Sequence, residues 1–153
     1  MLICFGCDTV FEPGNLFDVS FCPVRRCHHD VADIDDNIFE AVRLLNRKGY
    51  ETRFCCSGHS TDTLPRLYIN FCGHIYFEDL PDGFQIEYSE SNIENRCGGR
   101  VTTISRQYNR NQSNHDLQRE IWLVCDEIII WVKELPDFED DFDLEYYVDL
   151  DDD

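Results

Sequence analysis

The most informative stretch of the sequence is residues 34–56, IDDNIFEAVRLLNRKGYETRFCC, in which a helical pattern changes to a β pattern. Its apolar residues first recur three to four positions apart, which predicts an amphipathic helix. We expect an N-cap at Asp33 or Asp35 and an end near Lys48, where a glycine stops the helix. The residues that follow, Thr52 to Cys56, are typical of a β-strand.

Short β patterns continue to about Gln107. Turn signals such as Gly73 separate the runs of alternating apolar and polar residues. Strands are predicted over residues 67–71, 75–77, 84–88 and 101–105.

A second helix is predicted between a cap at Ser113 or Asn114 and a stop at Pro136. Its apolar stripe consists of Leu117, Ile121, Val124, Ile128 and Val132. Together these patterns predict an α+β fold, in which an antiparallel sheet of about four strands is packed by two long helices on one face.

Four of the nine cysteines lie within residues 1–30, at Cys4, Cys7, Cys22 and Cys27. Their spacing, C-x2-C and C-x4-C separated by fourteen residues, is close to that of a zinc ribbon. The alternatives are two disulfides or four core cysteines. An odd cysteine count without a secretory signal argues against a disulfide framework. We therefore predict an N-terminal zinc knuckle with four thiolates, saturated and hence structural.

The four-residue gap in the second pair leaves one choice of ligand open. His28 or His29 could replace Cys27 as the fourth ligand, and we favour Cys27. In the reducing compartment that we expect, the remaining cysteines are small buried hydrophobic residues.

A second group of cysteine and histidine residues surrounds the end of the first predicted strand. The run Cys55-Cys56-Ser57-Gly58-His59 lies there, and Cys72, His74 and Cys97 fall near turns of the same sheet. Such residues could form a second metal site, or a Cys–His pair for nucleophilic chemistry. Short Cys/His pairs also occur often without chemistry, so we expect a structural role for Cys56 and His59.

The charge balance is unusual, with 31 acidic residues against 13 basic ones and a net charge of −18. A field of this sign repels nucleic acid and favours basic partners. The final segment, 136–153, alternates acidic and aromatic residues, a pattern that suits binding to a basic, partly apolar surface. The predicted partner-binding residues are Asp140, Asp141, Asp143, Glu145, Tyr146 and Tyr147.

The chain is predicted to form one domain over residues 1–135, including the knuckle at 1–30, followed by the acidic aromatic tail. No apolar run is long enough to span a membrane, and the N-terminus has no signal-peptide pattern. We therefore expect a cytoplasmic protein. No glycine-rich phosphate loop, G-x-S-x-G elbow or H-E-x-x-H helix is present, and we expect no enzymatic activity.

The knuckle, the run Leu44-Leu45-Asn46-Arg47-Lys48-Gly49-Tyr50 and the run Phe54-Cys55-Cys56-Ser57-Gly58-His59 together resemble small proteins of phages and prophages of Gram-positive bacteria. The acidity and the additional cysteines make the chain similar to zinc-containing anti-CRISPR proteins of streptococcal phages. The resemblance covers Cys4 to about Tyr88 in motif order, and the tail only in character. It implies an inhibitor that binds the RNA-guided DNA nuclease of type II CRISPR systems, with zinc held by the four knuckle cysteines.

Three hypotheses follow for the function. The first is a phage-encoded inhibitor that obstructs loading of nucleic acid on that nuclease without chemistry. The second is a metal- or cysteine-dependent hydrolase centred on Cys56 and His59. The third is a zinc-ribbon adaptor of phage transcription or replication, which the net charge disfavours where direct DNA contact is needed.

Overall fold

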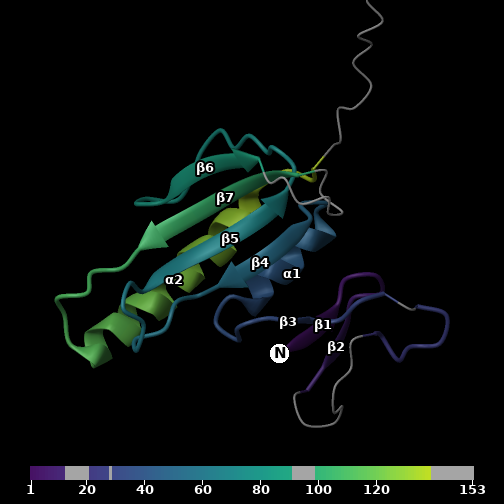
Figure 1. Ribbon diagram of the computed structural model, residues 1–153, viewed down its shortest axis with the longest axis horizontal. Coiled ribbons are helices and arrows are strands. Elements are labelled where there is room, and N and C mark those ends of the chain that lie inside the picture. Colours follow the sequence, from purple (N-terminus) through teal and green to yellow (C-terminus); the bar gives the residue numbers. More distant parts are fainter. Residues whose placement is uncertain (13–20, 28, 91–98, 139–153) are drawn as a thin grey trace, which may run out of the picture.

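The computed structural model describes residues 1–12, 21–27, 29–90 and 99–138. Within these residues the fold is α+β, as predicted, with two helices and two antiparallel sheets (Figure 1). The smaller sheet has three strands in the order β2-β1-β3, and the larger has four in the order β4-β5-β7-β6. The two sheets are separate units that share no strand pairing.

The smaller sheet is formed by β1 (Leu2–Cys4), β2 (Thr9–Phe11) and β3 (Ala32–Asp33). The larger sheet is formed by β4 (Thr52–Cys56), β5 (Arg66–Cys72), β6 (Gln85–Glu90) and β7 (Arg100–Gln107). The helices are α1 (Phe39–Arg47) and α2 (Asn114–Glu134).

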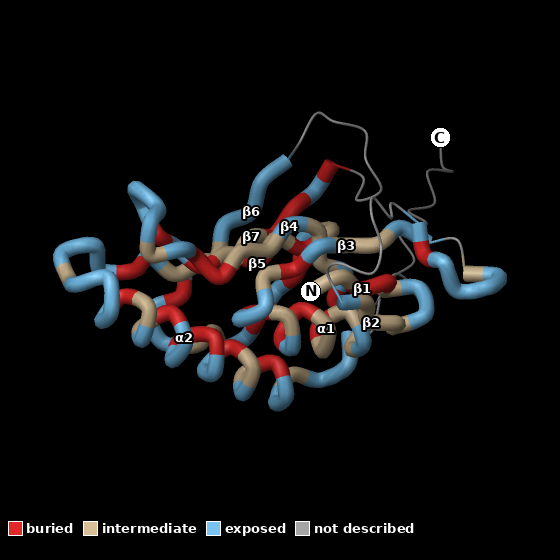
Figure 2. Tube along the Cα trace, turned by 90° about the horizontal axis from the view of Figure 1, so that it is seen from below, coloured by how far each residue is buried: buried red, intermediate tan, exposed pale blue. Residues whose placement is uncertain are grey.

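Both helices cover the same face of the larger sheet, and the buried residues lie between the two layers (Figures 1 and 2). The alternation predicted for β5 is confirmed, because Leu67, Ile69 and Phe71 are fully buried. The apolar stripe predicted for α2 is buried along its whole length. Ile3 of β1 belongs to the same core, which ties the small sheet to the rest of the molecule.

The boundaries of α2 agree with the predicted cap and stop. The Ser113 side chain is the N-cap and accepts a hydrogen bond from the backbone N–H of Asp116. Such a cap satisfies one of the free N–H groups of the first turn. The helix ends at Glu134, just before Leu135 and Pro136.

The predicted start of α1 is wrong. The helix begins at Phe39 and has nine residues, with Ile38 at the N-cap and no capping side chain. Asp33 lies in β3, and the Asp35 carboxylate accepts hydrogen bonds from Ser57 instead of from a helix terminus. The Asp35 carboxylate, which the local sequence suggested as a helix cap, therefore binds Ser57, a residue distant in sequence.

The strand predicted over residues 75–77 is also wrong, because this segment is a loop. Its apolar residues are nevertheless buried. Ile75 donates its backbone N–H to the Thr102 hydroxyl, which itself donates to the carbonyl of Gly73. Phe77 packs against Phe71, with ring centroids 5.3 Å apart. The buried residues of this loop thus show the same alternating apolar pattern as a buried strand.

The described start of the tail packs on the body. Lys48 donates from Nζ to the carbonyl of Leu135, and the Tyr50 hydroxyl donates to the carbonyl of Pro136. The Phe138 ring lies 5.1 Å from that of Tyr50. The six predicted partner-binding residues, 140 to 147, lie outside the described residues.

No helix in the described ranges combines the length and the apolar character that a membrane span requires.

Candidate metal centre

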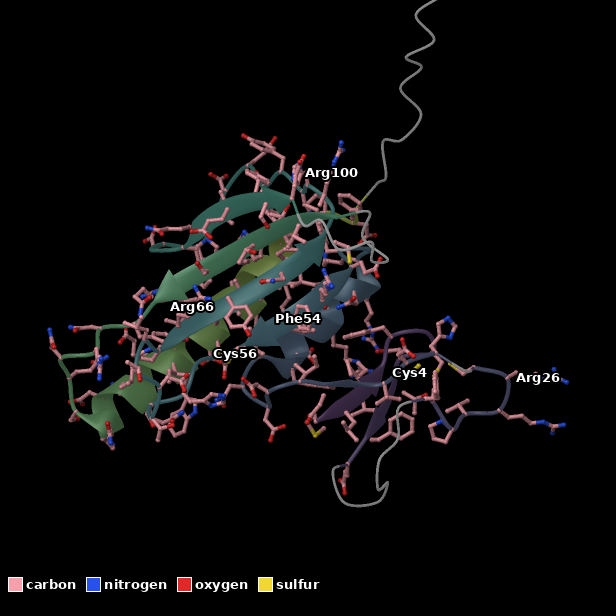
Figure 3. All side chains as sticks on the ribbon, in the orientation of Figure 1. Cys4, Arg26, Phe54, Cys56, Arg66 and Arg100 are labelled. Carbon is pink, nitrogen blue, oxygen red and sulfur yellow. The ribbon has the colours of Figure 1, made fainter. Side chains whose placement is uncertain are left out.

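The cysteine pairs are presented by the small sheet and by the loop that leads into it. Cys4 is the last residue of β1, and Cys7 lies in the turn that joins β1 to β2. Cys22 and Cys27 flank a loop whose ends are joined by a hydrogen bond from the Cys22 N–H to the carbonyl of His29. This loop carries Arg26 at its tip, away from the sheets (Figure 3).

The four sulfur atoms converge on one point. All four lie within 4.8 Å of one another. Cys4 Sγ is 3.5 Å from Cys27 Sγ, and Cys7 Sγ is 3.6 Å from Cys22 Sγ. Sulfurs bound to a shared tetrahedral zinc at about 2.3 Å would lie about 3.8 Å apart, whereas a disulfide has an S–S distance of about 2.05 Å.

The four thiols are free, so the disulfide alternative is not the arrangement found. The predicted ligand set is therefore brought together and can hold a metal ion. His28 lies outside the described residues. His29 is not part of the cluster, but its Nδ1 lies 3.3 Å from Cys27 Sγ and so contacts one ligand from outside.

Gly6 makes this packing of His29 possible. A Cβ atom at position 6 would lie 2.3 Å from the His29 ring, far inside van der Waals contact. Only glycine lets the turn between Cys4 and Cys7 accept the imidazole beside the cluster.

The protonation of the cysteines depends on their surroundings. The hydrogen bond between the Cys7 sulfur and the Thr9 hydroxyl, 3.1 Å long, lowers the pKa of Cys7 to about 6. Burial raises the pKa of Cys22 to about 12. Because thiolates are the ligands, an incoming metal ion must displace the proton of Cys22, and affinity must rise with pH.

A charge network fixes the first cysteine turn to α1. The Asp8 carboxylate, next to Cys7, accepts two hydrogen bonds from Arg43, at 2.8 and 2.9 Å, and is also bound by Arg47. Hydrogen bonds from Arg43, and after them those from Arg47, lower the pKa of Asp8 to about 2. The backbone of Asp8 has a positive φ of 55°, which asparagine and aspartate tolerate better than most residues.

We expect Asp8→Asn to lower the free energy of unfolding at pH 7 by about 1 kcal/mol, because a partly exposed charge network is lost at unchanged side-chain size. The difference from the wild type should shrink as the pH falls from about 4 toward 2, where Asp8 becomes protonated in the folded state. Denaturant unfolding across this range measures the effect. Asp126→Asn, on the exposed side of α2, is the matched control. A pH-independent difference would contradict the assignment.

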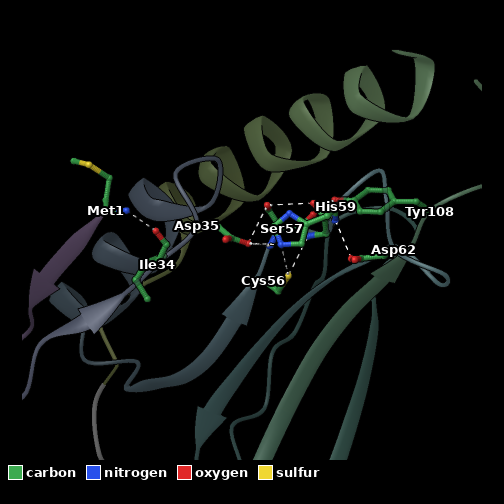
Figure 4. A network of polar contacts seen from close by, with 9 residues as sticks. Met1, Ile34, Asp35, Cys56, Ser57, His59, Asp62 and Tyr108 are labelled. Carbon is green, nitrogen blue, oxygen red and sulfur yellow. Dashed lines mark hydrogen bonds and ion pairs between the residues drawn. The ribbon is translucent and has the colours of Figure 1, made fainter. Parts of the chain in front are cut away.

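The second predicted group is only partly brought together. Cys56 and His59 lie side by side, and Asp35 joins them (Figure 4). Sequence reasoning missed Asp35, whose position before a helix suggested only a cap. Among the described residues, neither Cys72 nor His74 belongs to this cluster. Cys72 is disulfide-bonded, which corrects the expectation of a buried thiol, and Cys97 lies outside the described residues.

The geometry does not support Cys56 as a nucleophile activated by His59. Cys56 Sγ and Asp35 Oδ2 each lie 3.8 Å from the same ring nitrogen, Nε2 of His59. A catalytic triad needs the acid and the nucleophile on opposite ring nitrogens. Burial, followed by the nearby charge of Asp35, also raises the pKa of Cys56, so its thiol is poorly ionised.

A cleft of about 620 Å³ lies beside the cysteine cluster, between the small sheet and the edge strand β4. Its lining includes Gly6 and His29 from the cysteine loops and Thr52 and Arg53 from β4.

Comparison of the chain with protein-family models, with curated proteins and with solved structures gives no match.

Proposed function

We propose that this chain is a phage-encoded inhibitor that binds the RNA-guided DNA nuclease of type II CRISPR systems, obstructs loading of target DNA and carries one structural zinc ion. The observation that supports binding to a basic partner most directly is the excess of 31 acidic over 13 basic residues. The nuclease fits as the partner because it holds its nucleic acids in a positively charged channel. Many proteins are basic, and we choose this nuclease among them because the sequence motifs resemble those of anti-CRISPR proteins.

Zinc is the metal that best suits the cysteine cluster. Four thiolates form the set that structural zinc sites use, and they fill all tetrahedral positions. Such an ion has no place for water or substrate. Its role in this proposal is to hold the N-terminal loops in shape for binding.

Internal contacts of the basic residues strengthen the charge argument. Arg43 and Arg47 are engaged by Asp8, and Arg106 binds Glu127 at 2.7 Å. Lys48 donates to a backbone carbonyl. Arg25 and Arg26 are exposed, but the net charge of −18 would still speed encounter with a basic surface.

We expect the association rate with the nuclease to fall steeply as salt rises, because exposed charges more than about 8 Å apart are largely screened at physiological ionic strength. Two tail variants distinguish the contribution of the acidic side chains from that of the aromatic side chains. Neutralising Asp140, Asp141, Asp143 and Glu145 to the amides should lower the association rate, whereas Tyr146→Ala with Tyr147→Ala should raise the dissociation rate. Surface plasmon resonance at several salt concentrations distinguishes the two effects.

A chain ending at Phe138 is the sharpest deletion, because it keeps the packing of Phe138 on Tyr50 and removes nine acidic residues and no basic one. It should bind more weakly but still bind, since the body remains acidic. Target DNA bound beforehand should compete with the inhibitor. Binding that is indifferent to salt, to all three tail variants and to bound DNA would contradict the proposal.

A further inference from the structure

We propose that Asp35, Cys56 and His59 form a second metal site, which holds a divalent transition-metal ion on three ligands and leaves one coordination position open. This site is independent of the cysteine cluster and of the proposed inhibition. The observation that supports the second site is that one oxygen, one sulfur and one nitrogen lie within 4.8 Å of one another.

The fold brings the three ligands together from separate segments. Asp35 lies between β3 and α1, Cys56 ends β4, and His59 follows in the next loop (Figure 4). Neighbouring residues of a strand point to opposite faces. Cys55 accordingly packs against the core, and Cys56 faces Asp35 and His59.

Surrounding hydrogen bonds fix these ligands in place. The Asp35 carboxylate accepts from the Ser57 N–H at 3.0 Å and from its hydroxyl at 3.3 Å. The Cys56 sulfur accepts from the Gly58 N–H at 3.4 Å. The backbone N–H of His59 donates to the Asp62 carboxylate at 3.1 Å. Metal ligands are commonly oriented by partners of this kind.

The loop itself is fastened to the core. The Tyr108 hydroxyl donates to the carbonyl of Ser57 at 2.8 Å, and both residues are buried. Gly58 has a φ of +83°, and a Cβ there would lie 2.7 Å from the Tyr108 ring and 2.9 Å from the carbonyl oxygen of Arg66. These contacts favour the loop conformation that presents His59 to the other two ligands.

The positions of the atoms suit a metal ion better than a hydrogen-bonded relay. Both the Cys56 sulfur and the Asp35 oxygen face Nε2 of His59, each at 3.8 Å. The separation from the Asp35 oxygen exceeds an ordinary hydrogen bond, and the separation from the Cys56 sulfur is that of a long hydrogen bond to sulfur. Ligands of a tetrahedral zinc lie about 3.4–3.6 Å apart, close to the two 3.8 Å separations, and the third pair, Asp35 and Cys56, lies within 4.8 Å.

The site differs from the cysteine cluster in exposure and in donor set. The His59 and Asp35 side chains are 55% and 30% exposed, so solvent reaches the fourth position. Three protein ligands with one open position are typical of zinc sites that bind an exchangeable ligand. A mixed sulfur, nitrogen and oxygen set suits zinc or cobalt better than magnesium or calcium, which prefer oxygen alone.

Metal content of the full chain tests the proposal. With excess zinc, native mass spectrometry should find two ions per wild-type chain and one in His59→Ala. His115→Ala, which removes an exposed histidine outside both clusters, should keep two. In a cobalt titration, the zinc-loaded cysteine cluster stays spectrally silent. The further equivalent should then show a sulfur-to-cobalt charge-transfer band, which Cys56→Ser should abolish.

We expect His59→Ala to lower the affinity for the second metal ion by about 100-fold or more, because a direct ligand is lost. Even the loss of a residue that only supports a ligand typically lowers metal affinity by about 10- to 100-fold. Cys56→Ser serves as an independent variant of nearly unchanged size should His59→Ala fold poorly by circular dichroism. One ion per wild-type chain at saturating zinc would overturn the proposal. A cobalt band that survives Cys56→Ser in the folded protein would overturn it as well.

Discussion

Cys22→Ser is expected to abolish tight metal binding by the cysteine cluster and to unfold the small sheet. Cys22 is buried, and its sulfur lies 3.6 Å from that of Cys7 at the centre of the cluster. Apparent binding energies of structural zinc in small peptides are ~10–16 kcal/mol and count as folding energy. β1, β2 and β3 have only two or three residues each, so beyond the burial of Ile3 in the core and the Asp8 contacts with α1 they depend on the cysteine cluster.

Hydrogen exchange resolves this effect by region. In Cys22→Ser, the amides that pair β1 with β2 should lose protection, and those that pair β5 with β7 should keep most of theirs. Cys125→Ala, which removes a buried free cysteine of α2 outside both clusters, should leave the small sheet protected. Unchanged protection of β1 and β2 in Cys22→Ser would show that the small sheet stands without the metal.

Gly58→Ala is expected to have the second large effect, a loss of about 3 kcal/mol or more in the free energy of unfolding. Its φ of +83° costs a residue with a side chain about 1–2 kcal/mol. The added methyl group would also press on the Tyr108 ring and on the Arg66 carbonyl. The backbone cannot yield cheaply here, because the adjacent Ser57 is buried and hydrogen-bonded to Tyr108.

Gly73→Ala separates strain from collision. Gly73 has nearly the same φ, +86°, but a Cβ there would meet nothing within 4 Å. The free energy of unfolding of Gly73→Ala should therefore fall by only about 1–2 kcal/mol. Denaturant unfolding of both variants gives the comparison, and equal losses would rule out the collision at Gly58.

The sequence patterns that succeeded are those set by local periodicity. The stripe along α2 and the alternation along β5 each follow from one buried face, so Leu117 to Val132 and Leu67 to Phe71 could be placed without knowing their neighbours. The cysteine spacing succeeded for a similar reason, since two short pairs on tight turns restrict where the sulfurs can lie.

The failures involve partners that are distant in sequence or patterns that are ambiguous. Asp35 lies 22 residues before Ser57 in the sequence, so nothing nearby in sequence reveals its contacts with Ser57 and His59. Strands as short as β3, with two residues, show no period. Ile75 and Phe77 are buried by a loop, and alternation alone does not distinguish that from a strand.

Zinc K-edge X-ray absorption of His59→Ala tests the metal centre most directly, because this variant removes a ligand of the second proposed site and leaves the four knuckle cysteines intact. We expect one zinc per chain with four sulfur neighbours at about 2.3 Å. A first shell dominated by nitrogen and oxygen, or a folded chain that retains no zinc, would contradict it.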